Sequence, residues 1–433
     1  MSNDCIEAYR VGTVRPGRRW RGIRVFAATV VLVATPLAPV SAAGFYISSV
    51  GSPGSLGTAA SANVTNDWGP DATWANPAGL TGIGERRVMT ASGQLLIPFA
   101  EFDPSVGTGG GDDGGDIADP ALIPSFFFAQ RLNDDWAFGF GVSALQGGGV
   151  DYGENFVGRY GAIDVTLTGL AATWSVGHQL TDKLSWGIGG SLVQTVYEQT
   201  IAVNQGQFDD GRVAFRDLDD VGVQGIFGLQ YEFTDRFMFG ATYRSEFDAN
   251  LEGNVKFRNI VIPGVPNRRN LDVDWTNPQW IEAGFRYVTG RGHAFFISGN
   301  WQEWSEFSQN QLTIDTDRNN IVQTLERDFD DTWSLGIGYA TKTDTSDGFS
   351  VGLRYESSPV DDDKRTVDLP FDESWQVSAS YGRYKPDGSS GWSVGTTLAF
   401  FDDAEVDQTA QNTRFAGKYD DNIVAFVGLN FRF

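Results

Sequence analysis

The sequence has few of the residues that build disulfides, metal centres or helical membrane anchors. Its 433 residues include one cysteine, Cys5, and two histidines. A single thiol excludes an internal disulfide and a cysteine-rich metal site, and we expect neither a metal nor a cofactor. After residue 43 the chain contains no apolar run of the roughly 20 residues that a membrane-spanning helix needs. A disulfide scaffold and a bundle of membrane helices are therefore both excluded.

Basic residues are also scarce. Lys and Arg number 32 against 55 Asp and Glu, which gives a net charge of −23 at pH 7. The negatively charged phosphate backbone of a nucleic acid would repel such a chain, so we expect no nucleic-acid partner.

The first 42 residues differ from the rest. Six arginines precede an apolar run over 25–40 that Pro36 and Pro39 interrupt and that small residues follow. This pattern predicts a signal peptide over residues 1–42, cleaved before Ala43. An N-terminal anchor is the alternative, but the run is shorter than the roughly 20 residues that span a bilayer.

The remaining chain is rich in glycine and aromatic residues, with 53 Gly, 31 Phe, 13 Trp and 13 Tyr. Segments of about ten residues alternate between apolar and small or polar residues, which is typical of strands. In the last segment, Val427, Leu429, Phe431 and Phe433 share one face. In a soluble sandwich the opposite face would be charged; here it is mostly small and polar. Apolar residues outward, small residues inward and aromatics near strand ends predict a transmembrane β-barrel.

Connection lengths predict the strand number and the orientation. Short turns are expected near 133–135, 181–183, 234–236, 289–292, 341–348 and 385–391. Long polar loops are expected near 101–119, 147–162, 202–220, 251–275, 309–328, 359–371 and 402–420. Their alternation requires a fourteen-stranded antiparallel barrel over residues 87–433. The start of the first strand and the end of the last strand then both lie on the periplasmic side, where the short turns are.

Two other features of the barrel bear on function. His178 and His293 lie close to short turns and would face the periplasm, whereas outer-membrane lipid hydrolases act on the outer leaflet, so we expect no enzyme. Acidic runs, such as 109–116 and 359–365, fall in or beside the long loops. Their oxygens suit divalent cations that would bridge to lipopolysaccharide. A solvated acidic surface is the simpler interpretation, because none of the runs has the spacing of an EF-hand loop.

Residues 43–86 precede the first predicted strand and have no place in the wall. They contain Ala-rich and Pro-punctuated stretches, "GSPGSLGTAASANV" and "NDWGPDATWANPAGLTGIG". A short helical hatch inside the lumen, on the periplasmic side, would account for them.

Several stretches resemble the FadL/TodX family of outer-membrane transporters. They are "AGFYISSVGSPGSLGTAAS", "DATWANPAGLT", "YRSEFDANLEGNV", "NWQEWSEFSQNQL", "RYESSPVDDDKRTVDLP" and "GLNFRF", which occur in this order from Ala43 to Phe433. The resemblance implies a fourteen-stranded barrel with an N-terminal hatch that takes up long-chain fatty acids or aromatic hydrocarbons. In the hatch it points to Ala43 and Gly44, at the mature start, and to the motif Asn76, Pro77 and Ala78.

The family mechanism implies a kink in the third strand that lets an apolar ligand leave sideways into the bilayer. The matching stretch is "VSALQGGGVDYGENF", in which Gly147, Gly148 and Gly149 would weaken strand pairing. An ordinary glycine-rich start of a loop is the alternative. Gln146 precedes the glycines and is a candidate to contact the ligand.

The resemblance also implies basic residues that meet a fatty-acid carboxylate, but the matching positions here are Asn204 and the uncharged "QNQLTI". Three arginines out of phase with their apolar neighbours are candidate substitutes: Arg244, Arg286 and Arg354. They would either face the ligand or pair with carboxylates of the hatch or wall. Phe45 would either pack along an acyl chain or anchor the hatch.

The sequence thus predicts a multi-pass protein of the outer membrane of a Gram-negative bacterium. We expect it to pass long-chain fatty acids or similar hydrophobic molecules inward by passive, ligand-gated lateral diffusion. The alternatives are an aromatic hydrocarbon channel, a general porin and a structural barrel. Expected partners are the hydrophobic ligand, outer-membrane lipid, lipopolysaccharide and the barrel assembly machinery, which would recognise the last strand and its terminal Phe433.

Overall fold

The computed structural model describes residues 53–117, 120–261, 266–307, 309–316, 320–342, 347–369, 372–385 and 388–433. The predicted signal peptide, Ala43, Gly44 and Phe45 lie outside the described residues. Within them, no helix is both long and apolar enough to cross a membrane.

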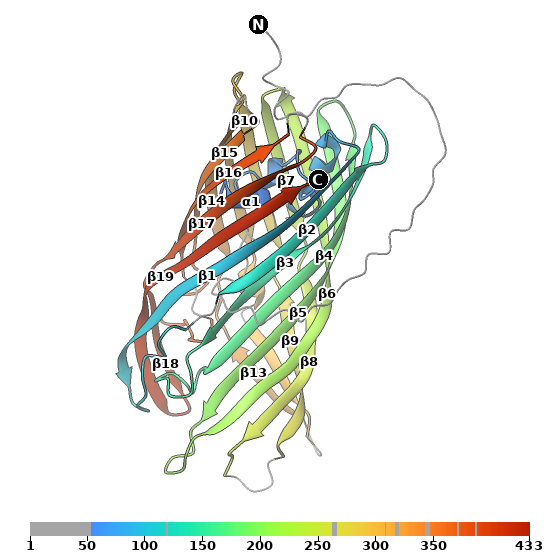
Figure 1. Ribbon diagram of the computed structural model, residues 1–433. Helices are drawn as coiled ribbons and strands as arrows, with labels where there is room; N and C mark the ends of the chain where they lie inside the picture. Colours follow the sequence, from blue (N-terminus) through green and yellow to red (C-terminus); the bar gives the residue numbers. More distant parts are fainter. Residues whose placement is uncertain are drawn as a thin grey trace.

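The wall is one antiparallel sheet that closes on itself (Figure 1). The first strand along the chain, β1 (Arg87–Gly107), pairs with the last, β19 (Thr413–Arg432), from Thr90↔Arg432 onward. Closure pairs the first strand with the last, whose edges would otherwise expose backbone groups to hydrocarbon, where they could not reach water. The wall is therefore a closed barrel of fourteen antiparallel membrane strands, as predicted.

Nine of the membrane strands are continuous and five are each interrupted once. The continuous ones are β1, β2 (Ala121–Arg131), β3 (Trp136–Asp151), β4 (Asp164–Gln179), β5 (Leu184–Val203), β6 (Gly211–Thr234), β15 (Asp347–Glu356), β16 (Ser374–Tyr384) and β19. The interrupted ones are β7 (Phe237–Arg244) with β8 (Phe247–Arg258), β9 (Arg268–Asn277) with β10 (Trp280–Val288), β11 (His293–Gln302) with β12 (Gln309–Ile314), β13 (Ile321–Glu326) with β14 (Thr332–Lys342), and β17 (Gly391–Phe401) with β18 (Ala404–Ala410).

Side chains alternate between lipid and lumen as the sequence predicts. Val427, Leu429, Phe431 and Phe433 of the last segment are exposed, whereas Phe426, one position before Val427, is buried. Aromatic side chains form two outward girdles. Phe237 and Phe285 stack near the short turns at 5.5 Å, and Tyr355 joins Trp333 and Trp375 toward the other end at 5.1 Å each.

The predicted long loops are too long, because strands continue through several of them. β5 ends at Val203 and β6 begins at Gly211, so the segment 202–220 is mostly strand. The segment 309–328 contains β12 and β13, and the segment 402–420 is a hairpin whose two turn residues, Gln411 and Asn412, have positive φ. Outside the bilayer both faces of a strand can be polar, so the alternation that marks a strand disappears while backbone pairing persists.

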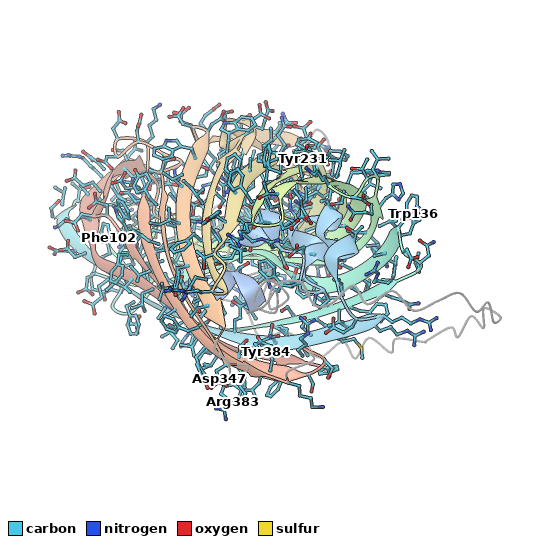
Figure 2. All side chains as sticks on the ribbon, turned by 90° about the horizontal axis from the view of Figure 1, so that it is seen from above. Phe102, Trp136, Tyr231, Asp347, Arg383 and Tyr384 are labelled. Carbon is cyan, nitrogen blue, oxygen red and sulfur yellow. The ribbon has the colours of Figure 1, made fainter. Side chains whose placement is uncertain are left out.

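In the described part of the chain, four short helices precede the wall and lie within the ring of strands (Figure 2). They are α1 (Pro53–Leu56), η2 (Asn63–Thr65), α2 (Ala72–Ala75) and η3 (Pro77–Gly82); a fifth, η4 (Trp304–Phe307), follows β11. We call residues 53–86 the N-terminal segment. It lies at the end of the barrel where the short turns and the C-terminus are found (Figure 1).

Candidate functional site: an apolar lumen above the N-terminal segment

The three arginines predicted to face the lumen, each from a different strand, help to attach the N-terminal segment to the wall. Arg286 of β10 forms two hydrogen bonds with the Asp67 carboxylate, at 2.6 and 2.8 Å, and a third with the Thr65 carbonyl. Both side chains of this ion pair are 8 % exposed. Removing one partner of such a pair would leave a buried charge uncompensated and cost about 3–5 kcal/mol.

The other two arginines contact the same segment. Arg354 of β15 donates to the Ala59 carbonyl at 2.8 Å, and Arg244 of β7 donates to the Trp74 carbonyl. The Arg244 guanidinium lies 4.5 Å from the Trp74 ring centroid and 4.9 Å from that of Trp280. Arg286 and Arg354 thus pair with carboxylates of the N-terminal segment and of the wall, whereas Arg244 faces a backbone carbonyl and two indole rings. Their contact with a ligand stays a prediction.

Asn76 joins the N-terminal segment to two neighbouring strands. Its Nδ2 donates to the Val64 carbonyl at 2.7 Å and to the wall carbonyls of Leu229 and Ala241 at 3.2 Å each. Its Oδ1 accepts from the Ala78 N–H, so it caps η3, with Pro77 at the first helical position. A side chain at Gly228 would collide with the Asn76 carboxamide, because an added Cβ would lie 2.1 Å from Oδ1.

Above this floor, the lumen is filled by one large apolar cluster. It begins at Trp74 and Trp280 and reaches Phe156, Val367 and Tyr419 near the long loops. Aromatic contacts run through it: Tyr197–Trp275 at 5.3 Å, Trp275–Phe307 at 4.7 Å and Phe102–Phe156 at 5.4 Å between ring centroids. An interior of this kind suits an apolar ligand and does not suit a polar solute that needs water along its path.

Loop residues fold inward at the extracellular end. Arg327, which follows β13, is 5 % exposed and forms an ion pair with Asp368 from the loop after β15. The Tyr152 hydroxyl donates to the Val367 carbonyl at 2.7 Å, and its burial raises the pKa of this phenol well above the usual value. Sequence reasoning missed Arg327 and Asp368, because charged residues in and beside the long loops were interpreted as a solvated acidic surface.

The wall has a gap in strand pairing between β2 and β3. The two strands pair from Arg131↔Ala137 to Phe126↔Val142 and no further. β2 continues to Ala121 against β1, and β3 continues to Asp151 against β4. Residues 121–125 and 143–150 therefore border a stretch without ladder pairs. Its outer end is closed by a hydrogen bond from the Asp151 N–H to the Ile117 carbonyl, at 2.7 Å.

The three glycines lie on β3 beside this gap, but they do not weaken its ladder with β4. Gly147, Gly148 and Gly149 pair with Thr168, Leu167 and Thr166. None is among the described glycines with positive φ. The loss of pairing expected at the glycines therefore affects only the edge of β3 that faces β2. On the other edge of β3, β4 supplies a partner for each glycine. A bulge between Ala144 and Gln146 shifts the register there.

The remaining predicted residues have simpler surroundings. Phe433 exchanges backbone hydrogen bonds with Met89 of β1, at 2.9 and 3.0 Å, and so takes part in closing the barrel. His178 stacks on Trp136 at 4.2 Å, and His293 Nδ1 lies 2.6 Å from the Tyr339 hydroxyl, both beside short turns. No group of three or more His, Cys, Asp or Glu among the described residues is arranged to hold a metal ion.

Comparison with known proteins identifies a matching family and several similar proteins. A family model described as "Outer membrane protein transport protein (OMPP1/FadL/TodX)" matches residues 31–433. The "Long-chain fatty acid transport protein" of Escherichia coli K12 is 23 % identical over 427 residues, covering 88 % of this chain and 91 % of that protein.

Solved structures share the fold. A Pseudomonas aeruginosa FadL homologue superposes with a TM-score of 0.80 at 17 % identity, covering 90 % of this chain and 99 % of the other. The Pseudomonas putida toluene transporter TodX gives a TM-score of 0.66 at 17 % identity, covering 84 % and 94 %.

Proposed function

Because the chain belongs to the OMPP1/FadL/TodX family of outer membrane transport proteins, we propose that it carries long-chain fatty acids or similar hydrophobic molecules inward by passive diffusion. The observation that carries this proposal is the apolar cluster between the N-terminal segment and the long loops. Each methylene removed from water contributes about 0.8 kcal/mol, so a chain of roughly sixteen carbons is strongly drawn into such an interior.

The proposed exit is lateral, through the gap between β2 and β3. Leu145 and Val150 of the apolar cluster lie on the unpaired stretch of β3, so apolar side chains of the interior reach the edge of the gap. A ligand that leaves there enters the hydrocarbon of the bilayer and never crosses water. Gly147, Gly148 and Gly149 suit this exit because they place no side chain along the unpaired edge.

The proposed gate is the N-terminal segment, a hatch that blocks the axial path. Asn76, Pro77 and Ala78 hold its last turn against β6 and β7, and Arg244, Arg286 and Arg354 hold the rest. Ligand gating requires that the mature N-terminus, with Ala43, Gly44 and Phe45, respond to an occupied lumen. We propose outer-membrane lipid, lipopolysaccharide and the barrel assembly machinery as further partners.

An aromatic hydrocarbon channel is the second candidate. It is favoured by one observation: the cations at the floor and at the extracellular end already face protein groups, so no carboxylate anchor is evident in the described lumen. A general porin and a purely structural barrel fit less well, because each leaves the apolar cluster without a purpose. We propose no catalytic activity.

Uptake by whole cells separates these candidates. Cells that lack their own long-chain fatty acid channel would express the full chain and receive labelled oleate, toluene or a small sugar. We expect rapid oleate uptake and sugar uptake no higher than in cells with an empty vector. Uptake of toluene alone would favour the second candidate, and uptake of sugar alone would overturn the proposal.

A further inference from the structure

Among the residues that the structure describes, three polar side chains beside the apolar cluster have no hydrogen-bond partner for their end atoms. They are Ser143 Oγ, both Oε1 and Nε2 of Gln146, and Thr195 Oγ1. The exposed fractions are 1 % for Ser143, 3 % for Gln146 and 0 % for Thr195. A buried polar group without a partner is destabilising, so such groups mark places where another molecule completes the hydrogen bonding.

The register brings Gln146 and Thr195 together. Gln146 pairs with Gly169 of β4, and Gly169 pairs with Thr195 of β5, so the three positions form one row across the wall. The Gln146 side chain lies over Gly169: a Cβ added there would be 2.4 Å from Gln146 Cγ and 3.1 Å from Nε2. The missing side chain at Gly169 therefore lets the carboxamide extend across β4 toward Thr195.

The surroundings of this row are apolar. Leu145, Leu167 and Val193, from the same three strands, belong to the apolar cluster. Ser143 and Gln146 also border the stretch of β3 that lacks ladder pairs with β2. The unpartnered atoms thus lie on the lumenal side of the wall, beside the gap.

We infer that Ser143, Gln146 and Thr195 form a neutral hydrogen-bonding subsite for the polar end of a long apolar ligand at the gap. The inference rests on the proposed function and specifies its substrate class. A carboxamide presents an acceptor and a donor side by side, so it complements a neutral head group that both donates and accepts. A primary alcohol has this property, and so does a fatty acid in its undissociated form. A carboxylate only accepts, so it would leave Oε1 unpaired and bring its charge into an apolar interior.

Binding of ligands with the same tail tests the subsite. The full chain in lipid nanodiscs would be titrated at pH 9 with oleyl alcohol, ionised oleate, methyl oleate and octadecene, each displacing one fluorescent lipid. One to two net hydrogen bonds correspond to about a tenfold difference in affinity. We expect the wild type to bind oleyl alcohol about tenfold more tightly than each of the other three ligands. Gln146→Leu should abolish this preference and leave octadecene affinity within twofold.

Two further variants keep the test decisive. Gln194→Leu makes the same change on an outward-facing position of β5 and should leave the preference intact. Thr195→Val replaces only the hydroxyl with a methyl group. It is the variant to measure if Gln146→Leu does not reach the folded, heat-modifiable form. Equal affinities in the wild type, or a preference retained in both Gln146→Leu and Thr195→Val, would overturn the inference. Failure of all four ligands to bind would overturn the proposed function as well.

Discussion

At the scale of single residues, polar side chains inside the lumen serve mainly to hold the N-terminal segment. Arg286, Arg354 and Asn76 each contact backbone carbonyls of that segment or of the wall behind it. The inward orientation of the two arginines is predictable from the sequence, since each is out of phase with apolar neighbours on a strand, whereas Asn76 caps a helix and was named only through the family motif. Their partners are not predictable, because Arg286 and Asp67 are more than two hundred positions apart and meet only once the barrel closes.

Asn76→Ala tests the gate at this scale. The substitution removes donors to Val64, Leu229 and Ala241, and an unsatisfied buried group costs about 1–3 kcal/mol. The wall does not depend on this side chain, so we expect normal amounts of heat-modifiable barrel but oleate uptake reduced severalfold. Normal uptake by the correctly inserted variant would show that Asn76 has no role in gating.

At the scale of elements, β2 and β3 share one feature: the edges that face each other are paired over only part of their length, whereas their other edges are paired throughout this stretch. Sequence reasoning located the unusual stretch through its glycines, but it could not tell which edge is affected. The affected edge depends on where β2 and β3 stop pairing, and no pattern within either strand reveals that point. The long loops were predicted too long because a strand end outside the bilayer carries no clear pattern either.

Replacing Gly147, Gly148 and Gly149 together by Val tests the exit at this scale. Valine favours strand pairing and adds bulk along the open edge. We expect oleate uptake to fall at least tenfold while ligand binding and heat-modifiable folding persist. Gly93→Val on β1 is the matched control, since its Cβ would meet only Leu122 Cδ1, at 3.6 Å. Equal losses in both variants would point to general damage to the wall.

At the scale of the whole molecule, the number of strands and their facing are the most predictable features. The apolar outer face that lipid requires leaves a period of two in each strand, and the alternation of short and long connections gives the number of strands. The arrangement of the lumen is less predictable, because residues such as Arg327 and Asp368 come from different loops. Neither loop has a periodicity that reveals which side chains turn inward.

Deleting Phe433 tests the closure of the barrel at this scale. The deletion removes two backbone hydrogen bonds to Met89 and the last aromatic residue of the proposed assembly signal. We expect severalfold less heat-modifiable protein in the outer membrane, measured by quantitative immunoblotting. Removing an equally exposed aromatic by Phe295→Ala should have little effect. An unchanged level after the deletion would exclude Phe433 as part of the signal.

The central claim, that the ligand leaves between β2 and β3, is tested most directly by closing the gap reversibly. Ser125 and Ser143 occupy the first positions beyond the last ladder pair, Phe126↔Val142. The native sequence has one cysteine, Cys5, which lies in the predicted signal peptide, so cysteines placed at positions 125 and 143 would be the reactive pair. Oleate uptake by this double variant would be measured after oxidation, with cross-linking checked by gel mobility, and again after reduction. The account predicts that oxidation abolishes uptake and that reduction restores it. Wild-type uptake by the fully cross-linked protein would contradict lateral release.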